Sequence, residues 1–452
     1  MRTDHRSGEP QATRHVAVVG SGIAGLSAAW LLSREHRVTL FETESRPGGH
    51  SNTVMVPTGG TQTPVDTGFI VYNERNYPNL SALFDHLGVA TERSSMSFAA
   101  SLDNGRLEYS SAGLDGLLGQ RSNSVSLRFW LMVRDIYRFY VEAPRLVSPV
   151  EYQSVTLGEY LDSNGYTPAF IEDHLLPMGA AIWSTTAKQM RAYPLVAFVR
   201  FFIHHGLLDL TDRPKWRTVS GGSIEYVKRM TAAVQDLRLG AGAAQIRREH
   251  GGITIIDTKG ERYWFHDVVI ATHADQALGL LADPDATEAS LLGAFDYTPN
   301  VAVLHSDTAL MPKRTRVWSS WNYIGESKDV AGDQPLCVTY WMNRLQNLDP
   351  QHPIFVTLNP TREIAADKIF RSFNYTHPLY DQKAVEAQQH LWRLQGNRHT
   401  YFAGSYFGHG FHEDALQAGL AAAEAVGGVR RPWIVAGASN RIAMPPLLEA
   451  AE

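Results

Sequence analysis

The chain has 452 residues, more than one hydrophobic core usually supports, so we expect two domains. Its 44% hydrophobic and 19% charged residues are typical of a globular enzyme and exclude a disordered chain. The net charge of −5 offers no general attraction for nucleic acid, and we predict no nucleic-acid partner. The single cysteine, Cys337, excludes an intramolecular disulfide, a CxxC redox pair and a thiolate metal site.

The N-terminal residues 1–14 are polar and lack the apolar core of a signal peptide. No segment approaches the ~18 consecutive apolar residues that a membrane helix requires. We therefore predict a flexible N-terminal tail on a cytoplasmic protein without a transmembrane segment.

A dinucleotide-binding fingerprint follows this tail. A β-branched strand at 15–19 leads into Gly20-x-Gly22-x-x-Gly25 and then into an alanine- and leucine-rich helix. Gly20 would permit the tight turn, Gly22 would let the backbone approach a pyrophosphate, and Gly25 would let helix and sheet pack closely. The free amides and the dipole at the helix start would then hold the pyrophosphate. The predicted contacts are Gly20, Gly22, Ile23, Ala24 and Gly25.

Glu42 ends the second predicted strand, residues 37–42. It follows the first glycine at the ~20-residue spacing of the acid that hydrogen-bonds a ribose. An acid here, where NADP enzymes use arginine, argues against a 2′-phosphate.

The segment after Glu42 carries Arg46, Gly48 and Gly49, and then Asp66 and Gly68. It is similar to the R-x-G-G-R and acid-x-G motifs of FAD enzymes in the amine-oxidase superfamily. This resemblance implies a non-covalently bound FAD. At His50 the chain departs from the motif, which has a second arginine there. The contacts that the resemblance implies in this region are Gly49, His50, Ser51, Gly68 and Phe69.

A glycine-rich turn and helix near the C-terminus form the second half of the predicted cofactor site. The sequence predicts a buried strand at 401–403 and a helix that opens near Glu413 or Asp414. Acids at a helix start stabilise the helix by capping. The same helix start would also stabilise negative charge on the N1/C2=O edge of a reduced flavin. The predicted contacts are Gly404, Ser405, Glu413 and Ala415.

Residues 215–280 are predicted to form short strands with glycine turns, followed by a buried strand that ends at Thr272. By resemblance, Ala243 would lie beside the adenine and Thr272 would also contact the cofactor. We therefore predict an α/β fold with a discontinuous Rossmann-like FAD-binding domain and an inserted α+β substrate domain. The FAD-binding domain would comprise 15–75, 215–280 and 395–428, the substrate domain 76–214 and 281–394, and the tails 1–14 and 429–452.

The first insertion, 76–214, is predicted to be mainly helical. The second, 281–394, is predicted to form antiparallel strands, over NVAVLHS, RVWSSWNYI, LCVTYWMN and IFVTLNP. Together they would cover the flavin and carry a large apolar pocket. The short apolar pieces of 429–452 would dock on the body or touch a membrane surface, of which we favour the former.

Three sequence segments indicate a narrower group of flavoproteins: GFIVYNERNYPNL (68–80), LPMGAAIWS (176–184) and GFHEDALQAG (410–419). They resemble the FAD oxidase-like N-terminal region of plant cyclopropane fatty acid synthases and its stand-alone bacterial relatives. The resemblance covers about 15–428 and implies a flavin oxidoreductase acting on, or beside, modified fatty acyl lipids. The chain carries no methyltransferase half, so we expect that it does not make cyclopropanes itself.

Removing hydrogen from an acyl chain would send a hydride to flavin N5 and a proton to a base. His409 and His412 are the candidate bases, and Tyr406 is a candidate wall over the flavin. We predict no metal, because the adjacent His204 and His205 would point apart on a helix. Only one fingerprint is present, so reduced flavin would pass electrons to oxygen, a quinone or a partner protein. Three alternatives stay open: an amine oxidase, a redox-neutral isomerase or hydratase, and a non-catalytic partner of a lipid methyltransferase.

Overall fold

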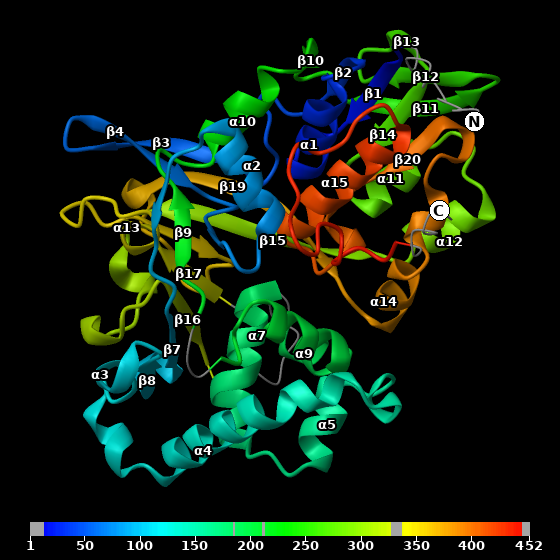
Figure 1. The fold of residues 1–452 in the computed structure, drawn as a ribbon. Coiled ribbons are helices and arrows are strands. Elements are labelled where there is room, and N and C mark those ends of the chain that lie inside the picture. The colour runs from blue at the N-terminus through cyan, green and yellow to red at the C-terminus, as the bar shows by residue number, and fades with distance from the viewer. Residues whose placement is uncertain (1–12, 184–185, 210–212, 327–336, 445–452) are drawn as a thin grey trace, which may run out of the picture.

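The computed structural model describes residues 13–183, 186–209, 213–326 and 337–444. A five-stranded parallel sheet lies at one end of the molecule and a seven-stranded sheet with a group of helices at the other (Figure 1). The parallel sheet has the order β10-β2-β1-β14-β20, with bounds Asp236–Arg238, Arg37–Phe41, His15–Val19, Asp267–Ile270 and Thr400–Phe402. Its central strands are buried runs of branched apolar residues, as expected for a parallel sheet covered on both faces.

Helices α1 (Ile23–Leu32) and α15 (His412–Val426) lie side by side on one face of this sheet (Figure 1). The antiparallel strands β11–β13 contact β1 and β14. Strands from 15–41, 236–238, 267–270 and 400–402 thus share one sheet, and the predicted mixed α/β fold with a discontinuous Rossmann-like unit is confirmed. The bounds of β11–β13 are Ala243–Glu249, Gly252–Asp257 and Arg262–Phe265.

The seven-stranded sheet has the order β19-β15-β18-β17-β16-β7-β8. Its bounds in that order are Ile369–Leu379, Asp296–His305, Phe355–Leu358, Cys337–Trp341, Trp321–Gly325, Phe98–Leu102 and Leu107–Ser110. The four predicted strands correspond to β15–β18, although β16 begins only at Trp321 because 315–317 form a 3₁₀ turn.

Two features of this sheet differ from the sequence prediction. The edge strand β19 was not predicted, because most of its residues are exposed or partly exposed and show no regular apolar alternation. Strands β7 and β8 come from the segment predicted as mainly helical, and β7 pairs in parallel with β16. The sheet is therefore assembled from both insertions, which sequence periodicity does not reveal.

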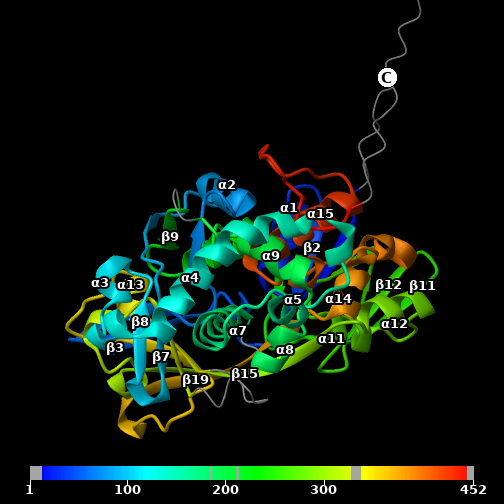
Figure 2. The ribbon, with the colours of Figure 1, turned by 90° about the horizontal axis from the view of Figure 1, so that it is seen from below.

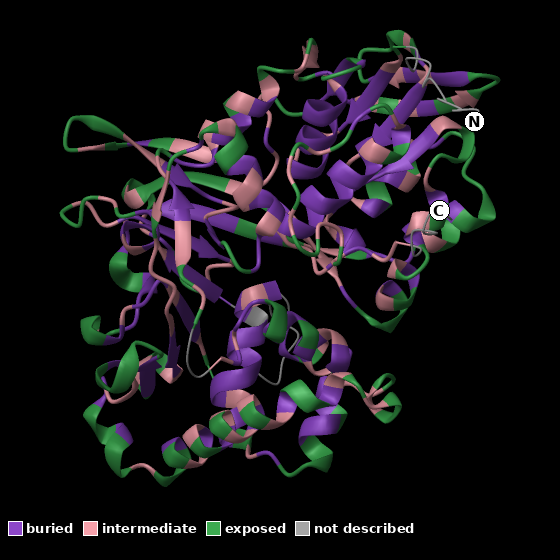
Figure 3. Cartoon of the chain, in the orientation of Figure 1, coloured by how far each residue is buried: buried purple, intermediate pink, exposed green. Residues whose placement is uncertain are grey.

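Helices of the first insertion form a layer at the lower end of the molecule (Figures 1 and 2). The helices of residues 113–204 are α3 (Gly113–Leu117), α4 (Leu127–Glu142), α5 (Leu157–Ser163), α6 (Pro168–Phe170), α7 (Leu176–Trp183), α8 (Ala187–Arg191) and α9 (Leu195–His204). Their aromatic side chains supply much of the core here, including the stacked pair Phe198 and Phe202. Figure 3 shows the buried side of these helices turned inward and exposed residues along the outer surface.

The remaining elements connect these parts. The ribbon β3–β4 spans Thr53–Thr58 and Thr61–Asp66, and the small sheet β5-β9-β6 spans Val71–Asn73, Trp216–Val219 and Thr91–Arg93. The remaining helices are α2 (Pro78–Leu87), α10 (Ile224–Thr231), α11 (Ala274–Leu280), α12 (Ala286–Leu292), α13 (Met342–Leu345) and α14 (Gln382–Gln388).

Residues 429–444 pack on the body, the favoured of the two expectations for the C-terminal segment. The guanidinium of Arg431 pairs with Glu424 at 2.9 Å, and Trp433 stacks on Trp30 of α1. Residues 1–12 and 445–452, on which the tail predictions otherwise rest, lie outside the described residues. Within the described ranges, every helix is too short or too polar to cross a membrane.

Gly419 decides how closely α1 and α15 approach. A Cβ on this residue would lie 2.1 Å from the carbonyl oxygen of Ala24 and 2.2 Å from Oγ of Ser27. Because backbone blocks the space, we expect Gly419→Ala to lower the free energy of unfolding by about 1–3 kcal/mol, measured by urea denaturation. Gly279→Ala in α11 is the control, because its Cβ would meet nothing within 4 Å. Equal effects of the two substitutions would contradict the prediction.

Candidate active site

The start of α1 is open to a ligand. A Cβ on Gly20 would lie 2.8 Å from the Ala271 carbonyl oxygen, and one on Gly25 would lie 1.8 Å from the Gly20 carbonyl oxygen. Gly22 differs, because a Cβ there would meet nothing within 4 Å. The first turn of α1 holds no acidic residue, and no side chain caps it. The N–H groups around Ile23 and Ala24 are therefore available to a phosphate, which fits a dinucleotide.

Glu42 lies beside this glycine turn at the end of β2. One carboxylate oxygen accepts hydrogen bonds from the backbone N–H of Ser21 at 2.9 Å and from its hydroxyl at 2.5 Å. The other accepts the backbone N–H of Glu44 at 2.9 Å. The acid is thus held next to the pyrophosphate position, and its contact with a ribose stays a prediction.

Ala243 and Thr272 flank the same region. Gly242, which precedes Ala243, packs against Thr43, where a Cβ would lie 2.1 Å from Oγ1. The methyl group of Thr272 would lie 3.3 Å from a Cβ on Gly20. Both predicted residues therefore lie along the edge of the sheet that carries the fingerprint.

The Gly48-Gly49 segment packs against the fingerprint and positions His50. A Cβ on Gly49, whose φ is 55°, would lie 3.0 Å from Cα of Gly22. The imidazole of His50 stacks on Tyr375 at 4.8 Å, and its Nε2 is buried without a hydrogen-bond partner among the described residues. Burial is the main cause that holds the pKa of His50 well below its usual value. A buried, unpartnered nitrogen at this position fits a bound cofactor or substrate.

The acid-x-G motif has a structural role. Asp66 accepts hydrogen bonds from the backbone N–H of Ser223 at 3.0 Å and its hydroxyl at 2.7 Å, which anchors the start of α10. A Cβ on Gly68 would lie 2.2 Å from the carbonyl oxygen of His50. The motif therefore fixes the backbone that carries His50, and the structure shows no separate evidence for a cofactor contact by Gly68.

Ser51, Tyr226, His412 and Phe69 form a connected group. The Tyr226 hydroxyl contacts Oγ of Ser51 and lies 2.8 Å from Nε2 of His412. The His412 imidazole stacks on Phe69 with 3.8 Å between ring centres. Desolvation lowers the pKa of His412 to about 3, so its imidazole is neutral near pH 7. Three predicted residues thus meet through Tyr226, which the sequence did not indicate.

The acids at the start of α15 serve structural purposes. Glu413 accepts the backbone N–H groups of Asn79 and Leu80, both at 3.0 Å, and so caps α2. Asp414 accepts the backbone N–H of Phe411 at 2.8 Å and pairs with Arg441. The Glu413 carboxylate is thus committed to another helix, and a contact of this residue with the cofactor stays a prediction for its backbone.

The side chains of His409 and Tyr406 pack against other elements than the group around Tyr226 does. The His409 ring faces Phe201 at 6.1 Å and His204 at 5.4 Å, both on α9. Desolvation lowers the pKa of His409 to about 4. The Tyr406 ring is buried 5.4 Å from Phe295 and packs over the backbone of Gly404. These contacts place Tyr406 in the core, so the structure gives no support for its role as a wall over the flavin.

Ser405 and Ala415 complete the predicted contacts. The Ser405 carbonyl accepts the backbone N–H of Gly410 at 3.1 Å, which closes the turn before α15. Ala415 is buried in the first turn of that helix. Their contacts with a cofactor stay predictions.

Two aromatic residues of the substrate side were missed. Tyr375 and His377 alternate on β19, so their side chains point to the same face of the strand, toward His50. Desolvation lowers the pKa of His377 to about 4. A strand prediction over 369–379 would have placed both side chains on one face of the strand, but not beside His50.

Known proteins match part of this sequence. A family model described as an NAD(P)-binding Rossmann-like domain matches residues 18–87. The L-amino-acid oxidase of Bungarus fasciatus is 58% identical over 41 residues, 9% of this chain and 8% of that protein. The hydroxyneurosporene desaturase of Rubrivivax gelatinosus is 46% identical over 68 residues, 15% of this chain and 12% of that protein. The matched segments thus span only about a tenth of these curated relatives.

Solved structures match nearly the whole chain. A putrescine oxidase bound to putrescine has a TM-score of 0.66 at 15% identity, covering 92% of this chain and 99% of its own. A fatty acid isomerase from P. acnes has a TM-score of 0.64 at 16% identity, covering 90% and 97%. This chain therefore has the fold of the amine-oxidase-like flavoproteins. This fold and the open start of α1 fit the predicted FAD.

A covalent link to Cys337 has no structural support. This thiol is buried in a separate apolar cluster with Val303, Leu310, Ile324 and Ile364. Burial raises the pKa of the thiol, which keeps it protonated and unreactive.

Alanine substitutions at Gly22 and Gly25 are expected to affect different properties, FAD binding at Gly22 and apoprotein stability at Gly25. We expect Gly22→Ala to leave the stability of the apoprotein unchanged, because the space beside it is empty and its φ of −62° suits alanine. The added methyl would meet the pyrophosphate and weaken FAD binding about tenfold or more, measured by flavin titration of the apoprotein. Gly25→Ala should instead destabilise the apoprotein. Unchanged FAD affinity in Gly22→Ala would contradict this position for the pyrophosphate.

The lowered pKa values of the two candidate bases predict a simple pH dependence. Desolvation disfavours the imidazolium, so His409 and His412 stay neutral at every pH above their pKa values of about 4 and about 3. We expect no inflection from either residue in the rate of flavin reduction between about pH 5 and 9. An inflection near 6.5 that disappears in His412→Gln or His409→Gln would show that the site does not depress that pKa.

Proposed function

We propose that this chain is an FAD-dependent oxidoreductase of the oxidase or desaturase type. Its substrate is a large apolar molecule, a fatty acyl lipid, and bound FAD would accept the substrate hydride at N5. The fingerprint, the open start of α1 and the fold support the cofactor. The resemblance to lipid-modifying flavoproteins and the similarity to a desaturase and a fatty acid isomerase support the substrate class.

The observation that carries the proposal is the uncharged junction around His50. His50, His377 and His412 all have lowered pKa values, and Phe69 and Tyr375 stack on them. Within the described ranges, no carboxylate is hydrogen-bonded to any of these rings. A cationic amine would be desolvated here without a counterion, whereas an acyl chain would lose no polar contacts. This favours a lipid over an amine.

Bound FAD would supply the hydride acceptor. The chain contributes binding at the α1 start, orientation through Glu42 and the segment around His50, and exclusion of water by the aromatic rings. Nε2 of His412 is engaged with Tyr226, and no described residue bonds its Nδ1. We propose that this neutral Nδ1 accepts the proton that leaves the substrate.

A redox-neutral isomerase is the second candidate. The fatty acid isomerase from P. acnes shares the fold over most of both chains. Such an enzyme would return the hydride to the substrate and need no electron acceptor, whereas the leading proposal predicts a net loss of two hydrogens.

Anaerobic mixing with candidate substrates tests the proposal. We expect phospholipids with unsaturated or methyl-branched acyl chains to bleach the flavin in a single turnover, and polyamines to leave it oxidised. Mass spectrometry should then show a product two hydrogens lighter. Bleaching by polyamines, or an isomer of unchanged mass, would overturn the lipid oxidation and favour the respective alternative.

The proton assignment has its own test. His412→Ala should slow single-turnover flavin reduction by roughly 100-fold or more while FAD stays bound, because a positioned base typically contributes that much. His409→Ala is the matched control, because this buried histidine lies three residues earlier and faces α9, and we expect a much smaller effect. Unchanged reduction in His412→Ala would show that this residue takes no proton.

A further inference from the structure

Exposed apolar side chains concentrate in one stretch of the chain. Seven of the fourteen exposed large hydrophobic residues among those the structure describes fall between positions 114 and 150. They are Leu114, Val125, Leu127, Trp130, Tyr137, Val141 and Val150. A contiguous group of exposed apolar residues on a folded protein marks an interaction surface, whereas isolated ones do not.

Helix α4 presents four of these residues in one stripe. Leu127, Trp130, Tyr137 and Val141 are 76%, 44%, 62% and 41% exposed, and their three-, seven- and four-residue steps keep them on one side of the helix. The opposite side buries Phe129, Met132, Asp135 and Phe139. Arg134 is exposed on the same side, and the four apolar residues there include a tryptophan and a tyrosine, the residues that favour a membrane–water interface.

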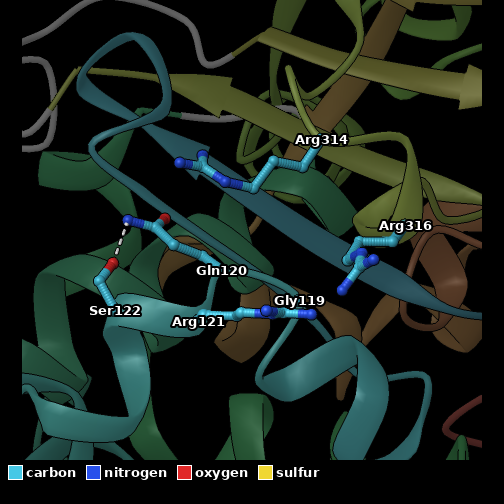
Figure 4. Close-up of a pocket in the computed structure, with 6 residues that line it drawn as sticks. All are labelled: Gly119, Gln120, Arg121, Ser122, Arg314 and Arg316. Carbon is cyan, nitrogen blue, oxygen red and sulfur yellow. Dashed lines mark hydrogen bonds between the residues drawn. The ribbon is translucent and has the colours of Figure 1, made fainter.

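A pocket of positive charge adjoins the N-terminal end of this stripe. It has a volume of about 440 Å³ and is lined by Gly119, Gln120, Arg121, Ser122, Arg314 and Arg316. Figure 4 shows Arg121 and Arg316 extending toward one another from separate segments. The exposed residue Val125 lies between the pocket and the stripe in sequence, and Nε1 of Trp130 donates to the Ser124 carbonyl at 3.0 Å.

The charge of this pocket is not balanced within the described part of the chain. Arg314 pairs with the buried Glu108 at 2.8 Å, but no described group forms an ion pair or hydrogen bond with the guanidinium of Arg121 or Arg316. Two like charges that point at one space favour an anion between them. The arginines of α4 differ, because Arg128, Arg134 and Arg138 each pair with an acid.

We propose that α4 and this pocket bind the surface of an anionic phospholipid bilayer. The pocket takes the phosphate of one lipid headgroup between Arg121 and Arg316, while Leu127, Trp130 and Tyr137 enter the boundary between headgroups and acyl chains. Unpaired positive charge beside an apolar stripe matches this partner in both chemistry and arrangement. The proposal concerns attachment to the bilayer and does not depend on the reaction proposed above.

Vesicle co-sedimentation of the flavin-loaded protein tests this surface. We expect binding to vesicles of phosphatidylcholine mixed with phosphatidylglycerol, weakening as salt is raised, and little binding to phosphatidylcholine alone. The double variant Arg121→Gln/Arg316→Gln should lose roughly 10-fold or more, since each basic residue near an anionic surface contributes about fivefold. Trp130→Ala should also weaken binding several-fold.

Matched controls lie elsewhere on the surface. Trp264→Ala removes a tryptophan that is also exposed, on β13, and Arg37→Gln/Arg262→Gln removes two exposed arginines of the parallel-sheet end. Flavin content and thermal unfolding show whether each variant is folded. Loss of vesicle binding only in the α4 and pocket variants supports the proposal. Equal loss in the controls, equal binding to neutral vesicles, no vesicle binding, or equally tight binding of soluble glycerol phosphate would each overturn it.

Discussion

The uncapped start of α1 is the feature on which the rest of the site depends. Gly20 and Gly25 allow the strand, the turn and the helix to pack backbone against backbone, so that no side chain fills the end of the helix. The N–H groups there stay available, and an anionic ligand can satisfy them. Gly49 packs on the same turn, which brings His50 and the residues after it to the site.

Tertiary contacts also decide the chemistry at the other end of the site. His412 is placed by Tyr226 and Phe69, two residues from distant parts of the chain. The buried acids beside it cap α2 and pair with Arg441, so they add no free charge to the junction. A junction without free charge supports the proposed hydride and proton removal from an apolar chain over the recognition of a charged amine.

Much of the fold followed from local pattern. The glycine spacing, the buried β-branched strands and the alternation over 300–306 and 337–341 were enough to predict the Rossmann-like unit and most of the second sheet. The sequence did not predict the edge strand β19, because the strand is largely exposed. For the same reason Tyr375 and His377 were not among the predicted site residues. Periodicity detects burial on one face, and an edge strand with polar residues on both faces lacks that signal.

The sequence by itself determined the Rossmann-like strand, glycine turn and helix around Gly20–Gly25, because those glycines impose backbone geometry that few other structures require. It also indicated where the second half of the site lies. Only the tertiary structure decided which side chains are free to act. Glu413 and His412 are neighbours in sequence, yet one carboxylate is committed to capping α2, while the imidazole faces Phe69 and Tyr226. Hydrogen bonds between residues hundreds of positions apart set that difference, and no local pattern encodes them.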